Sequence, residues 1–267
     1  MAHLVVAQCA WAATYYVRAS GRDDTDGLTP ATALRSIAAA AAKINNPGDE
    51  VVIGPGTYAE GNLSSPRNGI LGRPIAFRGD PTGRRTNDPP GPVRIEPRPP
   101  ATTGFLLLGR KFVEIADLEI VGGSDAAIQA RPSPDGRPSG NLTFVRLNAS
   151  GSAKRGIDVR GLVGSLRVEE CTVSTNGTAG VAVEGDGSSA EVLVGRSKIE
   201  ANNGPGLSVA NVVGAIISDN RFTQNVGAGV LVRAADTVAV TRNAFEANGE
   251  ESLNAGFPEP LNHLLLE

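Results

Sequence analysis

Short alternating runs of apolar and polar residues fill most of this chain, and from about residue 104 they recur in a fixed order. Segments 156–160, 180–184, 206–210 and 229–233 each begin with glycine and then alternate apolar residues with other types. Each is followed by a second apolar alternation and by a shorter third one. Because a period of two predicts a strand with one buried face, each unit predicts three short strands.

The spacing of the units indicates a solenoid. Their opening glycines are 24, 26 and 23 residues apart, and repeats of this length predict stacked coils, since one coil cannot bury its inner face alone. Each unit ends in an asparagine, which we expect to hydrogen-bond backbone groups of the neighbouring coils; these are Asn176, Asn202, Asn225 and Asn248. Ankyrin and tetratricopeptide arrays are excluded because the units lack paired helix-length segments.

The same pattern extends toward the N-terminus. Segments 104–108, 113–115 and Ile120 predict one coil, and segment 127–131 opens the next, with residues 131–140 as an inserted loop. A looser first coil is predicted from segments 51–53, 75–77 and 93–95. The sequence therefore predicts an all-β fold, a right-handed parallel β-helix with three sheets and about seven coils.

One segment has a helical pattern. Residues 31–44 are rich in alanine and place Leu34, Ile37 and Ile44 on one face, with Thr29 as the expected N-cap and Pro30 at the first helical position. We expect this short α-helix to cap the N-terminal end of the stack, because an open solenoid end exposes unpaired backbone.

These elements predict four regions. They are a signal-peptide remnant (1–13), an N-terminal strand with the capping helix (14–50), the parallel β-helix (51–252) and a C-terminal tail or cap (253–267). Residues 4–13 are typical of the end of a secretory signal, with a structural strand as the alternative. For the C-terminal region three interpretations stay open: a cap on the stack, a contact for oligomerisation, or the cut end of a truncated chain.

The composition excludes several classes of function. The 267 residues include 33 glycines and 18 prolines but only 4% aromatics, which favours many turns over large core helices. A net charge of −3 gives no basic surface for nucleic acid. No apolar run reaches the roughly 18 residues that a membrane span needs. The two cysteines, Cys9 and Cys171, form no metal-binding spacing, and we expect no organic cofactor.

The N-terminal region carries a family resemblance. It rests on segments 15–17, 26–27, 47–49 and 55–58, continued by segments 73–77 and 92–95. Together with the asparagine-ended units, these resemble secreted bacterial β-helix proteins of the pectate-lyase superfamily, most closely the pectate, alginate and chondroitin lyases. The resemblance implies a secreted or periplasmic protein that binds or degrades an acidic polysaccharide or another glycan; some members of the superfamily are non-catalytic.

The resemblance also implies a site on the outer face of the sheet built from the opening segments. Alternation points Gln129, Arg131, Asp158, Arg160 and Glu184 outward there in three neighbouring coils. If the protein is a lyase, Asp158, Glu184 and the turn residue Asp186 would share a Ca²⁺ ion. Arg160 would be the base, with Lys154 in reserve. Gln129, Arg131 and Arg233 would bind the substrate.

Two functions remain open at this point. The charged cluster on the expected face favours the lyase, although oppositely charged residues on an outer sheet face are also typical of solvated cross-strand pairs. The missing lysine and histidine constellation of the lyases favours a non-catalytic β-helix that binds carbohydrate or a partner protein. The only histidines are His3 and His263, which excludes the histidine-dependent hydrolases. The Asp-Pro-His signature of the epimerases is absent, and Ala234 follows Arg233 where the lyase pattern has histidine. The acidic loop 23–27 is interpreted as a turn before the helix.

Overall fold

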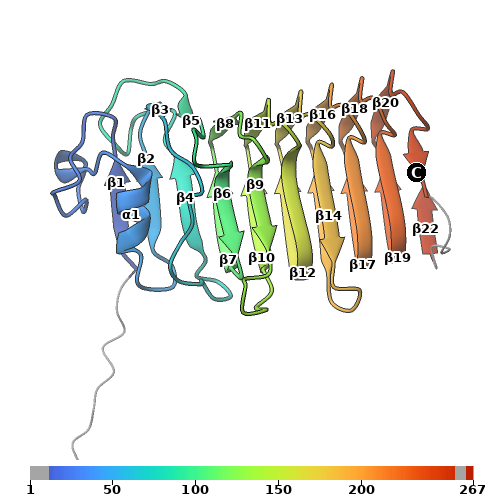
Figure 1. Cartoon of the computed structure of the whole chain (residues 1–267), viewed down its shortest axis with the longest axis horizontal. Coiled ribbons are helices and arrows are strands. Elements are labelled where there is room, and N and C mark those ends of the chain that lie inside the picture. The colour runs from blue at the N-terminus through green and yellow to red at the C-terminus, as the bar shows by residue number, and fades with distance from the viewer. Residues whose placement is uncertain (1–11, 256–262, 267) are drawn as a thin grey trace, which may run out of the picture.

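The structure is a computed structural model that describes residues 12–255 and 263–266. The chain winds into a parallel β-solenoid of about eight coils (Figure 1). Three sheets run along the stack. We name them the opening, middle and short sheets, in the order in which the chain passes through them within each coil.

The strands of each sheet pair in parallel from one coil to the next. The opening sheet contains β6 (Thr103–Leu108), β9 (Ala126–Arg131), the first part of β12 (Arg155–Glu169), β14 (Val181–Gly185), the first parts of β17 (Leu207–Ser218) and β19 (Val230–Thr241), and β21 (Leu253–Asn254). The middle sheet contains β1 (Thr14–Val17), β2 (Glu50–Ile53), β4 (Ile75–Gly79), β7 (Lys111–Ala116), β10 (Gly140–Val145), β15 (Glu191–Gly195), β22 (His263–Leu266) and the second parts of β12, β17 and β19. The short sheet contains β3 (Gly56–Tyr58), β5 (Val93–Ile95), β8 (Glu119–Val121), β11 (Asn148–Ser150), β13 (Thr172–Ser174), β16 (Lys198–Glu200), β18 (Arg221–Thr223) and β20 (Ala244–Glu246).

Three strands run directly from the opening sheet into the middle sheet. β12, β17 and β19 turn this corner at Gly161, Asn211 and Ala234, which have φ values of 59°, 53° and 47°. A single left-handed residue is enough to redirect the strand, and glycine and asparagine adopt it at low cost. In other coils the same corner is a short turn, as at Gly109 between β6 and β7, or carries an insertion, such as the loop between β9 and β10.

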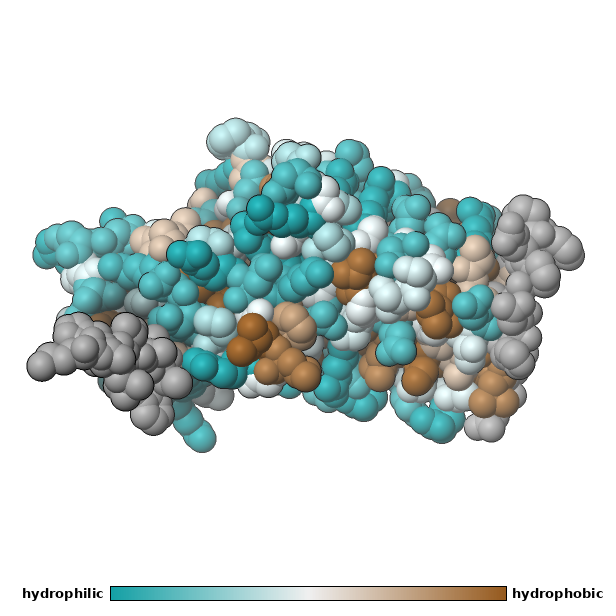
Figure 2. All heavy atoms as spheres, turned by 90° about the horizontal axis from the view of Figure 1, so that it is seen from below, coloured by the Kyte–Doolittle hydropathy of each residue, from teal (hydrophilic) through white to brown (hydrophobic). Residues whose placement is uncertain are grey.

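The core is one apolar column inside the coils. Along the opening sheet the inward residues stack in register, and all of them are fully buried: Phe105, Ile128, Ile157, Val181, Leu207 and Val230. Strand pairs stand about 4.8 Å apart, so each inward side chain packs on its counterpart in the next coil. Seen from below the view of Figure 1, the surface is mostly hydrophilic with scattered hydrophobic patches (Figure 2).

The expected asparagine ladder is confirmed. Asn202 is fully buried; its Nδ2 donates to Val173 O at 3.1 Å and to Asn225 Oδ1 at 2.9 Å, and its Oδ1 accepts from Asn176. A second ladder at the corner between the middle and short sheets joins Asn220 to Asn243 at 3.0 Å. These side chains satisfy backbone groups at corners where strand pairing is interrupted.

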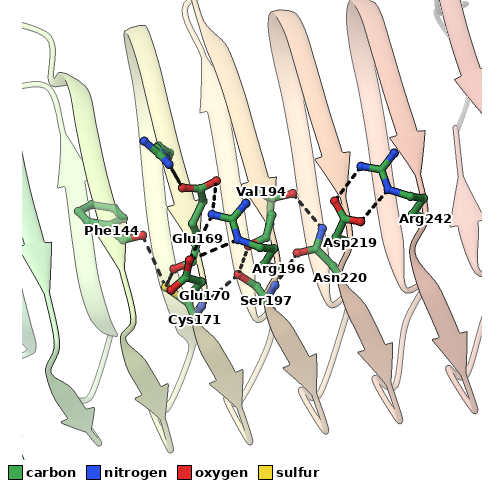
Figure 3. A network of polar contacts seen from close by, with 12 residues as sticks. Phe144, Glu169, Glu170, Cys171, Val194, Arg196, Ser197, Asp219, Asn220 and Arg242 are labelled. Carbon is green, nitrogen blue, oxygen red and sulfur yellow. Dashed lines mark hydrogen bonds and ion pairs between the residues drawn. The ribbon is translucent and has the colours of Figure 1, made fainter.

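A ladder of charges lies beside the second asparagine ladder (Figure 3). The left-handed residue at this corner alternates in sign over six successive coils: Asp117, Arg146, Glu170, Arg196, Asp219 and Arg242. Residues of adjacent coils form three salt bridges, Asp117–Arg146 at 2.6 Å, Glu170–Arg196 at 3.2 Å and Asp219–Arg242 at 2.7 Å. Exposed pairs contribute little individually, but the alternation avoids like charges on adjacent coils.

The prediction of about seven coils is too low. Segments 51–53 and 75–77, interpreted as parts of one coil, are β2 and β4, which pair with each other in the middle sheet and therefore belong to successive coils. Each coil has its own strand in the short sheet, β3 and β5. β3 escaped the pattern because it has only three residues and its first residue, Gly56, ends a Gly-Pro-Gly sequence.

The predicted helix 31–44 is too long. α1 spans Ile37–Lys43, and its N-cap is Ser36, whose Oγ accepts from Ala39 N at 3.1 Å. Thr29 instead caps a 3₁₀ turn, Pro30–Thr32. Between the two, Leu34 is fully buried and forms a parallel β-bridge with Val17. A continuous helix could not make this strand pairing. α1 packs on β1 and β2 at the N-terminal end.

Three further expectations concern the acidic loop 23–27, the C-terminal region and the predicted signal remnant. The carboxylate of Asp23 accepts from Arg35 N and Ser36 N, both at 2.9 Å, which confirms the acidic loop as a turn before the helix. At the other end, β21 and β22 both pair with β19 and so continue the stack. Of the predicted signal remnant, only Ala12 and Ala13 lie within the described residues, and Cys9 lies outside them.

None of the helices in the described part of the chain has the length and apolar character that crossing a membrane requires.

Candidate functional site

The outward columns expected on the opening sheet are confirmed by the strand register. One column runs through Leu106, Gln129, Asp158, Ala182, Ser208 and Leu231, each paired with the next. In the second column, Arg160 pairs with Glu184, Glu184 with Ala210, and Ala210 with Arg233. The residues predicted to share a face therefore do share it.

Asp158 is the centre of the site. Its side chain points outward from β12 but is only 2% exposed, because arginine side chains cover it. Arg160 Nε donates to Asp158 Oδ1 at 3.2 Å, and Arg131 Nη2 donates to Oδ2 at 3.2 Å. Arg155 Nη1 lies 3.5 Å from Oδ2. One carboxylate thus holds three guanidinium groups, and we call this set with Gln129, Asp125 and Lys154 the Asp158 cluster.

A second carboxylate extends the cluster toward the N-terminus. Gln129 Nε2 donates to Asp125 Oδ2 at 2.9 Å and to Asp158 Oδ2 at 3.3 Å, so the amide bridges the two acids. Lys154 Nζ lies 3.0 Å from Asp125 Oδ1. Burial alone would raise the pKa of Asp125, but hydrogen bonds from Gln129 and Lys154 outweigh it, and the pKa is lowered. Asp125 is therefore charged at neutral pH.

The cluster carries an excess of positive charge. Its four cations, Lys154, Arg131, Arg155 and Arg160, face the carboxylates of Asp125 and Asp158. With Glu184, which pairs with Arg160 in the next coil, the formal excess on this face is one positive charge. A shallow cavity of about 250 Å³ lies beside it, lined among others by Arg155, Asp158, Arg160, Glu184 and Ser208. Guanidinium groups can bind carboxylates through paired hydrogen bonds, so this face has the chemistry of an anion-binding surface.

The structure does not assemble the acidic set that the sequence suggested for Ca²⁺. Both oxygens of Asp158 are engaged by arginines, and Asp186 is held in its own turn by Ser188 and Ser189, whose backbone N–H groups lower its pKa. Within residues 12–255 and 263–266, no group of three or more His, Cys, Asp or Glu side chains can hold a metal ion.

Arg233, predicted to bind the substrate, lies away from the Asp158 cluster, whereas Arg155 and Asp125 belong to it. Arg233 lies two coils beyond Glu184, about 10 Å along the stack, and its side chain is exposed. Arg155 and Asp125 were missed in the sequence. The available signal was their position at the start of adjacent opening strands, where Arg155 pairs with Ala126, the residue after Asp125.

Comparison with solved structures finds the same fold in polysaccharide-acting enzymes. A pectate lyase, Pel9A, superposes with a TM-score of 0.63 at 17% identity, covering 97% of this chain and 78% of the lyase. The periplasmic alginate epimerase AlgG gives 0.53 at 12% identity, with 82% and 60% covered. The A-module of the Azotobacter vinelandii mannuronan C-5 epimerase AlgE4 gives 0.52 at 13% identity, with 77% and 65% covered. At these identities the likeness concerns the fold.

Sequence comparison identifies the family. No curated protein matches the chain. The family model described as "Right handed beta helix region" matches residues 103–257, the part in which the repeat units and both asparagine ladders lie. Because this match covers more than half of the 267 residues, the protein belongs to the right-handed β-helix family.

Proposed function

We propose that this protein is a carbohydrate-active β-helix that binds an acidic, uronate-containing polysaccharide on the outer face of its opening sheet. The observation that carries the proposal is the Asp158 cluster, in which four cations face two carboxylates on one strip of the surface. A uronate polymer presents carboxylates at regular intervals, so it matches a fixed row of guanidinium groups.

The buried carboxylate prepares the arginines for this task. Arg160 uses only Nε to reach Asp158, which leaves the N–H groups of Nη1 and Nη2 without partners within the described residues. Its side chain is 41% exposed. Because Asp158 fixes the guanidinium plane beforehand, a substrate carboxylate can bind with less loss of side-chain entropy. Gln129, which bridges Asp125 and Asp158, fixes the acids in turn.

A polysaccharide lyase is the second candidate, favoured by the amine of Lys154 at the edge of the cluster. In β-elimination a base removes the proton alpha to the uronate carboxylate. The electron pair then forms a C4–C5 double bond, the C4–O glycosidic bond breaks, and the leaving oxygen takes up a proton. A guanidinium keeps its proton in proteins, so we assign Arg160 to the developing carboxylate charge and Lys154, once deprotonated, to the base.

Export is part of this proposal, because uronate polysaccharides are found outside the cell membrane. The apolar segment 4–13 supports it, and AlgG, which shares the fold, is a periplasmic protein. Fractionation of cells producing the full chain would place the protein in the medium or periplasm. Recovery of all of it in the cytoplasm, with its N-terminus intact, would contradict export.

The test of binding compares acidic and neutral polymers by affinity electrophoresis or calorimetry. Polygalacturonate, alginate and chondroitin are each compared with a neutral glucan. We expect binding to an acidic polymer only, and Arg160→Gln or Arg155→Gln to weaken it about tenfold, which corresponds to about 1.4 kcal/mol. Arg22→Gln removes an exposed cation in the N-terminal turn and is the matched control. Equal affinity of Arg160→Gln and the wild type would overturn the proposal.

Lyase activity is tested separately by the ultraviolet absorbance of unsaturated uronate ends, with added Ca²⁺ and with a chelator. Product that disappears in Lys154→Ala, while polymer binding persists, would establish the lyase and its base. Binding without product on any of the three acidic polymers would leave a binding protein.

A further inference from the structure

Arg110 is a partly buried cation that has no acidic partner within the described residues. It follows Gly109 at the corner between β6 and β7. Its Nη1 donates to Pro66 O at 3.4 Å, and its Nε is buried without a hydrogen-bond partner. Burial lowers the pKa of Arg110, and the charge of Arg137 lowers it further. The surroundings therefore disfavour this charge instead of compensating it.

The guanidinium lines a cavity at the N-terminal end of the solenoid. The cavity has a volume of about 380 Å³ and lies between α1 and residues 61–66. Ala38, Ala41 and Leu63 supply apolar wall, and Asn62 and Ser64 supply polar groups. Pockets that bind small molecules have this size and this mixture, with mostly apolar walls and a few convergent polar groups.

The polar groups around the cavity retain donors. Asn62 Oδ1 accepts from the backbone N–H groups of Thr102 and Thr103, both at 3.2 Å, which leaves the amide Nδ2 as a donor without a partner in the described residues. The hydroxyl of Ser64 also forms no hydrogen bond there. With Arg110, the residues described as lining the cavity thus carry N–H and O–H donors, and none of them is a carboxylate.

We infer that this cavity binds a small sugar acid, whose carboxylate pairs with Arg110 and whose hydroxyl groups face Asn62 and Ser64. An uncompensated cation in a partly buried site is costly, and an anionic ligand would supply the missing charge. A planar carboxylate matches the two parallel donors of a guanidinium. The site is separate from the Asp158 cluster, so either can exist without the other.

Calorimetry with glucuronate as the probe and glucose as its neutral analogue tests the site in the full chain. We expect saturable binding of glucuronate and none of glucose. Arg110→Gln should weaken glucuronate binding at least tenfold. Arg67→Gln, an exposed arginine next to the cavity-lining segment 61–66, removes the same charge without lining the cavity and should bind as the wild type does.

The outcomes distinguish this site from the Asp158 cluster. Glucuronate binding that is lost in Arg160→Gln but kept in Arg110→Gln would overturn the inference and place the ligand at the Asp158 cluster. Absence of saturable binding to the wild type would overturn it too. To detect misfolding, the urea midpoint of Arg110→Gln is measured in parallel; Arg110→Lys, which keeps the charge but loses the paired donors, should bind with intermediate affinity.

Discussion

Nε of Arg160 lies 3.2 Å from Oδ1 of Asp158, two residues earlier on the same strand. Residues at this spacing share a face of a strand, so their proximity follows from alternation alone. The burial of Asp158 does not: its side chain is nearly inaccessible because Arg131 reaches it from the neighbouring coil and Arg155 from the start of the same strand. These contacts hold the carboxylate of Asp158 and the surrounding guanidinium groups in fixed positions on the surface.

Replacing Asp158 with asparagine should destabilise the protein. The substitution removes the charge shared by three arginines and leaves their donors without an anion, for a loss of about 2 kcal/mol. Urea unfolding monitored by circular dichroism measures the effect. Asp24→Asn breaks an exposed pair with Arg22 and should leave the midpoint unchanged; equal midpoints for the wild type and Asp158→Asn would contradict the prediction.

Removing a central asparagine of the first ladder should cost more than removing a terminal one. Asn202→Ala deprives Val173 O, Asn176 N and the Asn225 side chain of a buried partner, and we expect a loss of about 3 kcal/mol. Asn248 is partly exposed and has a coil on one side only in the described ladder. Asn248→Ala should therefore shift the urea midpoint less, and the reverse order would contradict the ladder's role.

Stability should fall in acid, partly through Glu50. Burial raises the pKa of this carboxyl, but hydrogen bonds from Arg85 and Arg78 outweigh it and bring the pKa below its ordinary value of 4.5. A lowered folded-state pKa means that the contribution is fully present above about pH 4.5 and is lost as the pH falls through the folded-state pKa. Unfolding midpoints from pH 7 to 3 should decline less steeply in Glu50→Gln than in the wild type; parallel declines would refute this.

Cys171 should be inert in the folded protein. Its side chain is buried, Sγ donates to Glu169 O at 3.2 Å, and burial raises the pKa of the thiol to about 11. Since the thiolate is the reactive form, a thiol reagent at pH 8 should label Cys171 only in urea. A Cys9→Ser background removes the other thiol. Rapid labelling without denaturant would show that the coil around Cys171 opens.

Much of the fold follows from the sequence because a solenoid repeats one local rule. The period of two defined the inward residues, and glycine and asparagine marked the corners. The register of equivalent positions from coil to coil then placed Gln129 beside Asp158 and Arg160 beside Glu184, as the strand pairs have it. Where the rule weakens, in the long loops before residue 100, the division into coils was wrong, and β2 and β4 were merged.

The extent of the helix and the chemistry of the site depended on tertiary structure. Leu34 is extended because it pairs with Val17, a contact that helix propensity does not contain. Alternation gave the face of Asp158 and Glu184 but not the direction of the carboxylate oxygens. Arginines engage those of Asp158, and serines engage those of the turn residue Asp186. The sequence determined the backbone path because strand pairing is periodic and local. Only the folded structure decided which charges meet, because long side chains reach across coils and choose among several partners at similar distances.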